Sequence, residues 1–468
     1  MILGGSDMGK KVYPYIPNSV AEVQEEMLKF IGVGSIEDLI ADIPEEVRMK
    51  EPMELPEPFE DEAGIYRHVS GIMNKNKTAE ELRCFLGAGC YNRYVPAVVD
   101  EVINRSEFLT AYAGEPYEDH GRFHALFEYQ SMMAELLDFD ICNVPNYDGS
   151  QACGTALRMA TRITKRKEVL IPRNLNPDVL KVVETYLQPE VKITYVNYND
   201  KTGRICLDSL KACLTDKAAA VLVMNPNFFG IIEDKAQEIA DMAHKVGALM
   251  VAYVEPSTLG VLTPPSRYGA DMACGDIQPL GIHMNYGGGV AGFVAANEKP
   301  EIIEEYPSRL FGIAPTSEGE WGFGDVLWER TSFANRDSAK EFVGTHSALW
   351  GIAAGVYLAS MGPHGMRELG ETILQRQVCL KKALAKVKGV DLDRFTGTPF
   401  EEIVVDFSST GKTVKEINEK LLEKGILGGY DLAECFPELE GCSLLCVTEQ
   451  TTAEDIKAIA DALCEILG

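Results

Sequence analysis

Apolar runs of strand length alternate with helical segments through the middle of the chain. The runs cover residues 167–171, 191–197, 218–224 and 248–254, and the stretches between them, such as 234–246, repeat apolar positions with a helical period. Because these strands are almost wholly apolar, both of their faces must be covered. The pattern predicts an α/β fold with a doubly wound, mainly parallel sheet and helices on both faces.

The N-terminal part follows a different pattern, in which short helical segments are separated by breakers. Ser19 is placed to cap a helix through Lys29, and Ser35 is placed to cap a second helix through Ala41. Residues 51–62 are rich in proline and acid and predict irregular structure. Helical patterns resume near Ala79. We interpret residues 1–66 as a helical arm.

Beyond about residue 330 the pattern changes again, to long helices with a few isolated strands. Strands are predicted at 402–407 and 443–447, and helices at 413–425 and 453–466. The chain is therefore expected to hold a large α/β domain at 67–330 and a small C-terminal α+β domain at 331–468.

Composition narrows the class of protein. The chain of 468 residues carries 71 acidic and 44 basic residues, a formal net charge of −27, which argues against nucleic acid as a partner. Its twelve cysteines form no CxxC pair, which is typical of reduced thiols in the cytoplasm. No stretch approaches the roughly 20 apolar residues of a membrane helix, so we expect a cytoplasmic protein without a membrane partner.

A turn of small residues precedes a predicted helix at 146–156. Asp148, Gly149 and Ser150 open this helix, where small side chains let an anion reach the backbone N–H groups. The segment predicts a phosphate cradle. An ordinary capped helix with a small packing face explains the same residues.

Two features of the sequence concern the carboxyl edge of the predicted sheet: an acid and a missing lysine. Glu255 ends the strand at 248–254, at the carboxyl edge where ligands bind in open α/β sheets. In a pyridoxal-phosphate (PLP) site an acid there keeps the pyridine nitrogen protonated, although a solvated strand-end carboxylate is the simpler interpretation. Such a site also needs a lysine after the next strand, yet none occurs between Lys245 and Lys299. The apolar stretch 274–289 predicts a packed or interfacial segment, with a flexible surface loop as the alternative.

His120 and His124 have a spacing that resembles a metal site, beside two carboxylates. Gly121 weakens the helix that would align the two side chains. We therefore assign no metal to them.

These motifs together resemble the α subunit of two-subunit glycine dehydrogenase (decarboxylating), the P-protein of the glycine cleavage system. The resemblance covers nearly the whole chain, and family-specific strings carry it: 15–18 (YIPN), 43–48 (IPEEVR), 85–89 (FLGAG), 94–100 (YVPAVVD), 105–108 (RSEF), 125–130 (ALFEYQ), 147–149 (YDG), 226–234 (PNFFGIIED), 278–281 (QPLG) and 425–432 (GILGGYDL).

The resemblance implies a fold-type-I PLP-dependent transferase architecture and a homologous β subunit, in an α2β2 assembly. In that family the β subunit supplies the lysine that holds PLP, glycine is decarboxylated, and the aminomethyl group passes to the lipoyl arm of the H-protein. Leu280 falls at the lysine position, so this chain has no Schiff-base residue of its own. The resemblance implies that the following residues line a site shared with the partner: Tyr112, Glu115, Tyr117, His120, Asn176, Glu255, His283, Thr345 and His346.

Departures from the family pattern leave other functions open. The segment 113–120 is rewritten, Asn176 replaces a histidine, and Glu255 replaces an aspartate. One alternative is a divergent two-subunit PLP enzyme that acts on another small or modified amino acid, with an equivalent carrier in place of the H-protein. Another is a scaffold subunit without catalytic function.

Overall fold

The computed structural model describes residues 12–13, 15–51, 53–59, 61–109, 120–287, 290–341 and 347–468. The chain divides into two compact units, residues 1–77 and 78–468. Each unit is described by itself. The predicted boundary between a large and a small domain near residue 330 stays a prediction.

The described elements of the first unit are helical, and the arm predicted at 1–66 stays a prediction. This unit contains η1 (Pro17–Ser19), α1 (Ala21–Ile31), α2 (Ile36–Leu39), η2 (Glu45–Val47) and α3 (Glu62–Met73). None of these elements contains a buried residue.

The predicted helix starts in this unit are partly right. Ser35 caps α2 through a capping box with Asp38, although the helix ends at Leu39 rather than at Ala41. Ser19 does not cap α1, because its hydroxyl oxygen accepts a hydrogen bond from the Tyr13 N–H at 2.9 Å instead.

The helix expected near Ala79 is absent from the described residues there. Glu81 accepts the Thr78 N–H at 2.9 Å, which closes a turn just before a strand begins at Arg83. A helix lies earlier, at α3, where the Asp61 carboxylate accepts the Gly64 N–H at 2.6 Å. The irregular segment therefore ends at Asp61.

A seven-stranded sheet forms the centre of the second unit, in the order β2-β8-β7-β6-β5-β3-β4. Strands β3 to β7 are parallel, and β8 runs antiparallel to both β7 and β2. The strands are β2 (Ile141–Cys142), β3 (Glu168–Pro172), β4 (Lys192–Val196), β5 (Ala218–Asn225), β6 (Leu249–Val254), β7 (Met272–Asp276) and β8 (Gly292–Ala296). The four predicted strands of this sheet are confirmed to within a residue or two at each end.

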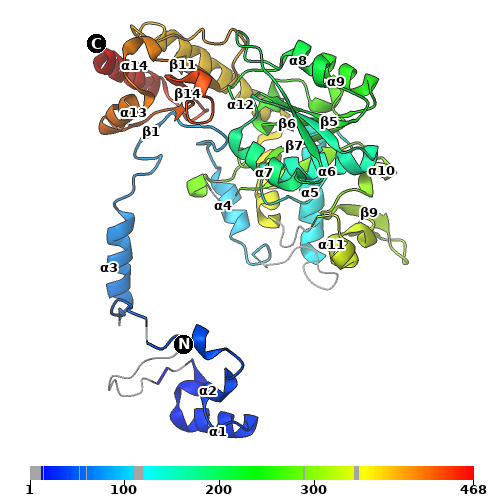
Figure 1. Ribbon diagram of the computed structural model, residues 1–468, viewed down its shortest axis with the longest axis vertical. Coiled ribbons are helices and arrows are strands. Elements are labelled where there is room, and N and C mark those ends of the chain that lie inside the picture. Colours follow the sequence, from blue (N-terminus) through cyan, green and yellow to red (C-terminus); the bar gives the residue numbers. More distant parts are fainter. Residues whose placement is uncertain are drawn as a thin grey trace. The chain divides into compact units, whose positions relative to one another are not determined.

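Helices cover both faces of the sheet, and α7 and α9 lie on opposite sides of β5 and β6 (Figure 1). Alternate strand residues enter two separate cores: Val169 and Val251 pack on the side of α6 and α7, while Leu170 and Met250 pack on the side of α5, α9 and α12. The helices are α4 (Ala97–Ile103), α5 (His120–Leu137), α6 (Gly149–Thr164), α7 (Pro177–Leu187), α8 (Leu207–Cys213), α9 (Ala236–Lys245), α10 (Pro300–Ile303) and α11 (Ser332–Asn335). The doubly wound α/β prediction is confirmed.

The C-terminal part builds a smaller antiparallel sheet, in the order β11-β14-β13, with a core of its own. Its elements are α12 (Ala348–Leu384), β11 (Glu402–Asp406), α13 (Val414–Glu423), β12 (Ile426–Leu427), β13 (Tyr430–Asp431), β14 (Cys442–Cys446) and α14 (Ala453–Leu467). Strand β1 (Arg83–Cys84) pairs with β12, so the segment before α4 joins this part. Strands β9 (Phe311–Pro315) and β10 (Trp321–Asp325) pair with each other as an antiparallel hairpin that belongs to neither of these sheets.

Short 3₁₀ helices complete the unit: η3 (Pro256–Gly260), η4 (Pro265–Tyr268), η5 (Asn285–Gly287), η6 (Trp328–Arg330), η7 (Arg336–Ser338), η8 (Ser408–Thr410) and η9 (Pro437–Leu439). All twelve cysteines lie in described segments, and none forms a disulfide. Across the described ranges, no helix combines the length and the apolar character that a membrane crossing requires.

Candidate functional site

A pocket lies at the carboxyl edge of the large sheet, where β5, β6 and β7 end. Its empty space is about 510 Å³, including the part open to solvent. It is lined by Gly89, Tyr91, Asn176, Met224, Pro226, Asn227, Gly230, Tyr253, Val254, Glu255, Asp276, Pro279, Glu401 and Glu402. Four carboxylates therefore border one pocket, and none of the described residues that line it is a lysine.

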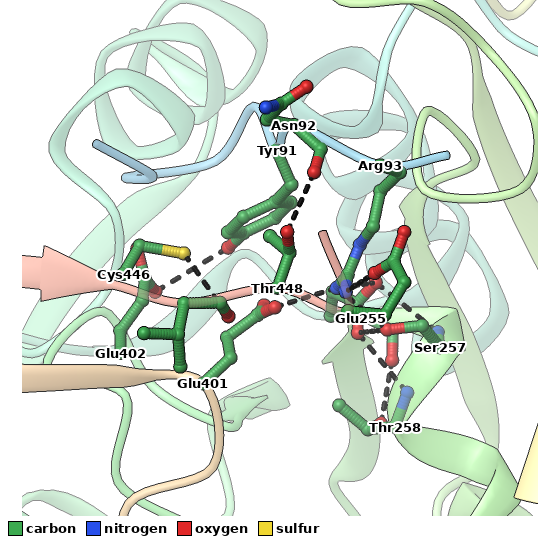
Figure 2. A network of polar contacts seen from close by, with 12 residues as sticks. Tyr91, Asn92, Arg93, Glu255, Ser257, Thr258, Glu401, Glu402, Cys446 and Thr448 are labelled. Atoms are coloured by element: carbon green, nitrogen blue, oxygen red, sulfur yellow. Dashed lines mark hydrogen bonds and ion pairs between the residues drawn. The ribbon is translucent and has the colours of Figure 1, made fainter. Parts of the chain in front are cut away.

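Arg93 is the cation beside these carboxylates (Figure 2). Its side chain is fully buried, and its guanidinium lies 2.6 Å from Glu401, 3.0 Å from Glu449 and 3.6 Å from Glu255. It also donates to the Ser257 hydroxyl at 2.9 Å. One buried cation thus joins the end of β6 to the C-terminal part of the chain.

Glu255 is fixed in place by the start of η3. Its carboxylate accepts the Ser257 hydroxyl at 2.6 Å and the Thr258 N–H at 3.1 Å. With Arg93 beside it, this carboxylate is a bonded member of the network rather than a solvated strand end.

Burial pushes three acids of the pocket toward protonation. It raises the pKa of Glu401 well above the usual range, although Arg93 opposes the shift. It raises the pKa of Glu402 to about 7, against hydrogen bonds from the Ala88 N–H and the Tyr91 hydroxyl. It also raises the pKa of Asp276 to about 7, with Gly149 and Gln278 as opposing donors. The pocket can therefore hold protons near neutral pH.

The start of α6 carries the residues predicted as a phosphate cradle. Asp148 caps the helix by accepting the Gln151 N–H at 2.7 Å. The Gly149 N–H donates to Asp276 at 2.9 Å, and Ser150 follows at the second helical position. Two carboxylates of the chain itself thus meet this helix end.

The other predicted site residues lie in different surroundings. Asn176 borders the pocket, caps α7 and donates to the Ala88 carbonyl at 3.1 Å. Leu280 is fully buried in the core shared by α5, α9 and α12. His283 is exposed, with its Nε2 atom 3.0 Å from Asp100 on α4.

Some predicted residues fall outside the described ranges. These are Tyr112, Glu115, Tyr117, Thr345 and His346, while His120 begins α5 without a described side chain. His124 contacts Glu128 at 3.1 Å and stacks on Phe323. Among the described residues, no group of three His, Cys, Asp or Glu side chains is arranged to hold a metal.

Sequence reasoning missed the residues that give the pocket its charge, namely Arg93, Asp276, Glu401, Glu402 and Glu449. Asp276 carried a usable signal, because it ends the strand next to that of Glu255, at the same sheet edge. Two consecutive glutamates at the start of a buried apolar strand were a second signal, since buried acids need partners.

Fold and pocket together define the class of protein. The sheet order, the pocket at its carboxyl edge and the small α+β part form the architecture of fold-type-I PLP enzymes. A sphingosine-1-phosphate lyase of Burkholderia pseudomallei shares the fold at 13% identity, with a TM-score of 0.65 over 89% of this chain and 92% of its own. A NifS-like protein from Rickettsia africae shares it at 15% identity, with a TM-score of 0.60 over 82% of this chain and 98% of its own.

The chain belongs to the glycine cleavage system P-protein family, which matches residues 13–463. Relatives described as "Probable glycine dehydrogenase (decarboxylating) subunit 1" include that of Pyrococcus furiosus, 41% identical over 98% of this chain and 100% of its own length. That of Staphylothermus marinus is 38% identical, over 97% and 98%. A crystal structure of inhibitor-bound glycine decarboxylase (P-protein) has a TM-score of 0.85 at 33% identity, over 98% of this chain and all of that chain.

Proposed function

We propose that this chain is the subunit without the catalytic lysine in a two-subunit glycine dehydrogenase (decarboxylating). The assembly decarboxylates glycine and passes the aminomethyl group to the lipoyl arm of an H-protein. The observation that carries the proposal is the pocket itself: it stands at the sheet edge where this fold binds its cofactor, yet four carboxylates and no lysine line the part that is described.

The residues of this pocket do not fit a covalently held PLP. Leu280, at the position that the resemblance assigns to the lysine, is packed in the core, and Pro279 borders the pocket instead. The N–H groups at the start of α6 donate to Asp148 and Asp276. The cofactor is therefore proposed to be bound by a homologous lysine-bearing subunit, at or near the interface of an α2β2 assembly.

The role proposed for this chain is to shape and support a shared site. Asn176 and Glu255 border the pocket, and the contacts of Arg93 hold the sheet edge and the C-terminal part in fixed register. Tyr112, Glu115, Tyr117, His120, His283, Thr345 and His346 remain proposed as residues that line this shared site. The twelve unpaired cysteines suit a reducing compartment, so we place the assembly in the cytoplasm.

A reconstitution experiment tests this function. The tagged chain is used to recover its partner from native cytosol, and the chain, the partner and the pair are then compared by visible spectrum and by glycine-dependent exchange of labelled CO2. We expect the chain alone to be colourless and inactive and the pair to show both signals, with transfer of label to lipoylated H-protein. Activity of the lone chain contradicts the proposal.

The same pair separates glycine from other substrates. Titration with a panel of small amino acids is expected to shift the spectrum with glycine at the lowest concentration. A shift with another amine and none with glycine supports the divergent-enzyme alternative. Failure to recover any PLP-bearing homologue supports the scaffold alternative.

A further inference from the structure

The N-terminus of α6 faces the end of strand β7. A helix N-terminus combines free N–H groups with partial positive charge, and phosphates commonly bind there. In this chain the Gly149 N–H donates to Oδ2 of Asp276 at 2.9 Å, and the Gln151 N–H donates to Oδ1 of Asp148 at 2.7 Å. Carboxylates of the protein thus occupy two of the hydrogen bonds that an external anion would use.

Asp276 is held in this place from two directions. Its Oδ1 atom accepts the Gln278 N–H at 2.8 Å, and its backbone pairs with Gly292 of β8. A Cβ atom added to Gly149 would lie 2.7 Å from the Asp276 nitrogen and 2.6 Å from the Tyr253 hydroxyl. The helix end and the strand end are therefore already in contact, and only glycine permits the approach.

The acids of the pocket also oppose the binding of an anion at this helix end. Asp276 borders the pocket together with Glu255, Glu401 and Glu402. Above about pH 7, where the carboxyls of Asp276 and Glu402 are ionised, these acids repel a phosphate in the pocket.

We infer that Asp276 is a built-in anion that takes the place of a ligand phosphate at the N-terminus of α6 and closes this pocket to phosphorylated ligands. The inference concerns the residues of this chain alone. It holds or fails whichever reaction the assembly performs.

Calorimetry on the purified chain at about pH 8, where the carboxyl of Asp276 is ionised, tests the inference, with inorganic phosphate and PLP as separate probes. Asp276→Ser removes the carboxylate and frees the Gly149 N–H. We expect it to bind phosphate at least about tenfold more tightly than the unmodified chain, because one repelling charge is lost and one helix N–H is released. Glu402→Gln is the matched control: it removes a pocket acid of similar burial and leaves the helix end intact, so only the smaller gain from lost repulsion is expected.

Three results overturn the inference. The unmodified chain binds phosphate or PLP as tightly as Asp276→Ser, or the folded variant gains no affinity, or Glu402→Gln gains as much. If Asp276→Ser does not fold, Asp276→Asn removes the charge and keeps an acceptor for the Gln278 N–H. A folded Asp276→Asn chain without any gain in phosphate affinity also overturns it.

Discussion

Replacing Arg93 by methionine is the sharpest test of how the pocket is held together. The substitution keeps an unbranched apolar side chain and deletes the cation that contacts Glu255, Glu401 and Glu449. We expect a loss of stability that depends on pH.

The size of the stability loss depends on which hydrogen-bond donors each acid retains. Glu255 keeps donors from Ser257 and Thr258, and Glu449 keeps the Tyr94 N–H at 2.7 Å. Glu401 has a side chain only 5% exposed and loses its 2.6 Å partner. Removing one member of a buried ion pair costs about 3–5 kcal/mol, and we expect the lower end because two of the three acids stay partly satisfied.

The dependence of this stability loss on pH is a second readout of the buried charge. Without Arg93, the buried acids avoid unpaired charge by taking up protons, which is easier in acid. Chemical denaturation at about pH 5.5 and about pH 8 should therefore show the larger loss at the higher pH.

Arg267→Met is the matched control. Arg267 pairs with Asp138 at 2.8 Å, but both side chains are well exposed, so about 1 kcal/mol or less is expected. If Arg93→Met costs no more than Arg267→Met, or if its cost does not change with pH, the description of a buried charge network is wrong.

Three further predictions concern the pocket and its surroundings. Burial raises the pKa of Glu402 to about 7, so its contribution to stability is fully present below the unfolded pKa near 4.5 and is lost as pH rises through about 7. In urea titrations the unmodified chain should therefore lose stability relative to Glu402→Gln between these two pH values. Parallel stability curves for the two proteins refute this. Gly149→Ala should destabilise the chain by about 1–3 kcal/mol, because the added Cβ meets Tyr253 and strand β7. Gly71→Ala, on α3 with nothing near the added Cβ, should cause no loss. Equal melting temperatures for the two variants refute the close contact. Leu280→Lys should lower stability and add no visible absorbance with PLP beyond that of the unmodified chain, because position 280 points into the core; a coloured adduct found in the variant alone contradicts that placement.

The large sheet could be predicted from the sequence because its strands are short apolar runs between breakers. Burial on both faces leaves few alternatives for such segments. Glu255 followed from the same pattern, since it ends a predicted strand, whereas Asn176 followed from the family resemblance; both border the pocket. Ser19 and Ala79 show where local signals fail, because each lies at a plausible helix start next to a competing turn: the Ser19 hydroxyl accepts the Tyr13 N–H, and the Thr78 N–H beside Ala79 donates to Glu81.

The rest of the pocket depends on contacts that no local pattern contains. Arg93 lies in an irregular stretch, and Glu449 follows β14, in a turn before α14. Neither residue has a periodic context that marks it as buried. They meet where the segment before α4 lies against the C-terminal part, which the pairing of β1 with β12 and the bond from the Thr448 hydroxyl to the Asn92 carbonyl hold in place.

The separation of these partners along the chain has a consequence for biosynthesis. Arg93 and Glu449 are 356 positions apart, so the glutamate emerges from the ribosome long after the arginine. At about 5–20 residues per second this interval is tens of seconds, during which the guanidinium has water rather than its final carboxylates. A chain truncated before Glu401 lacks two of the three acids, and we expect it to keep Arg93 hydrated and the sheet edge open. The complete ion network thus forms only after Glu449 has been synthesised.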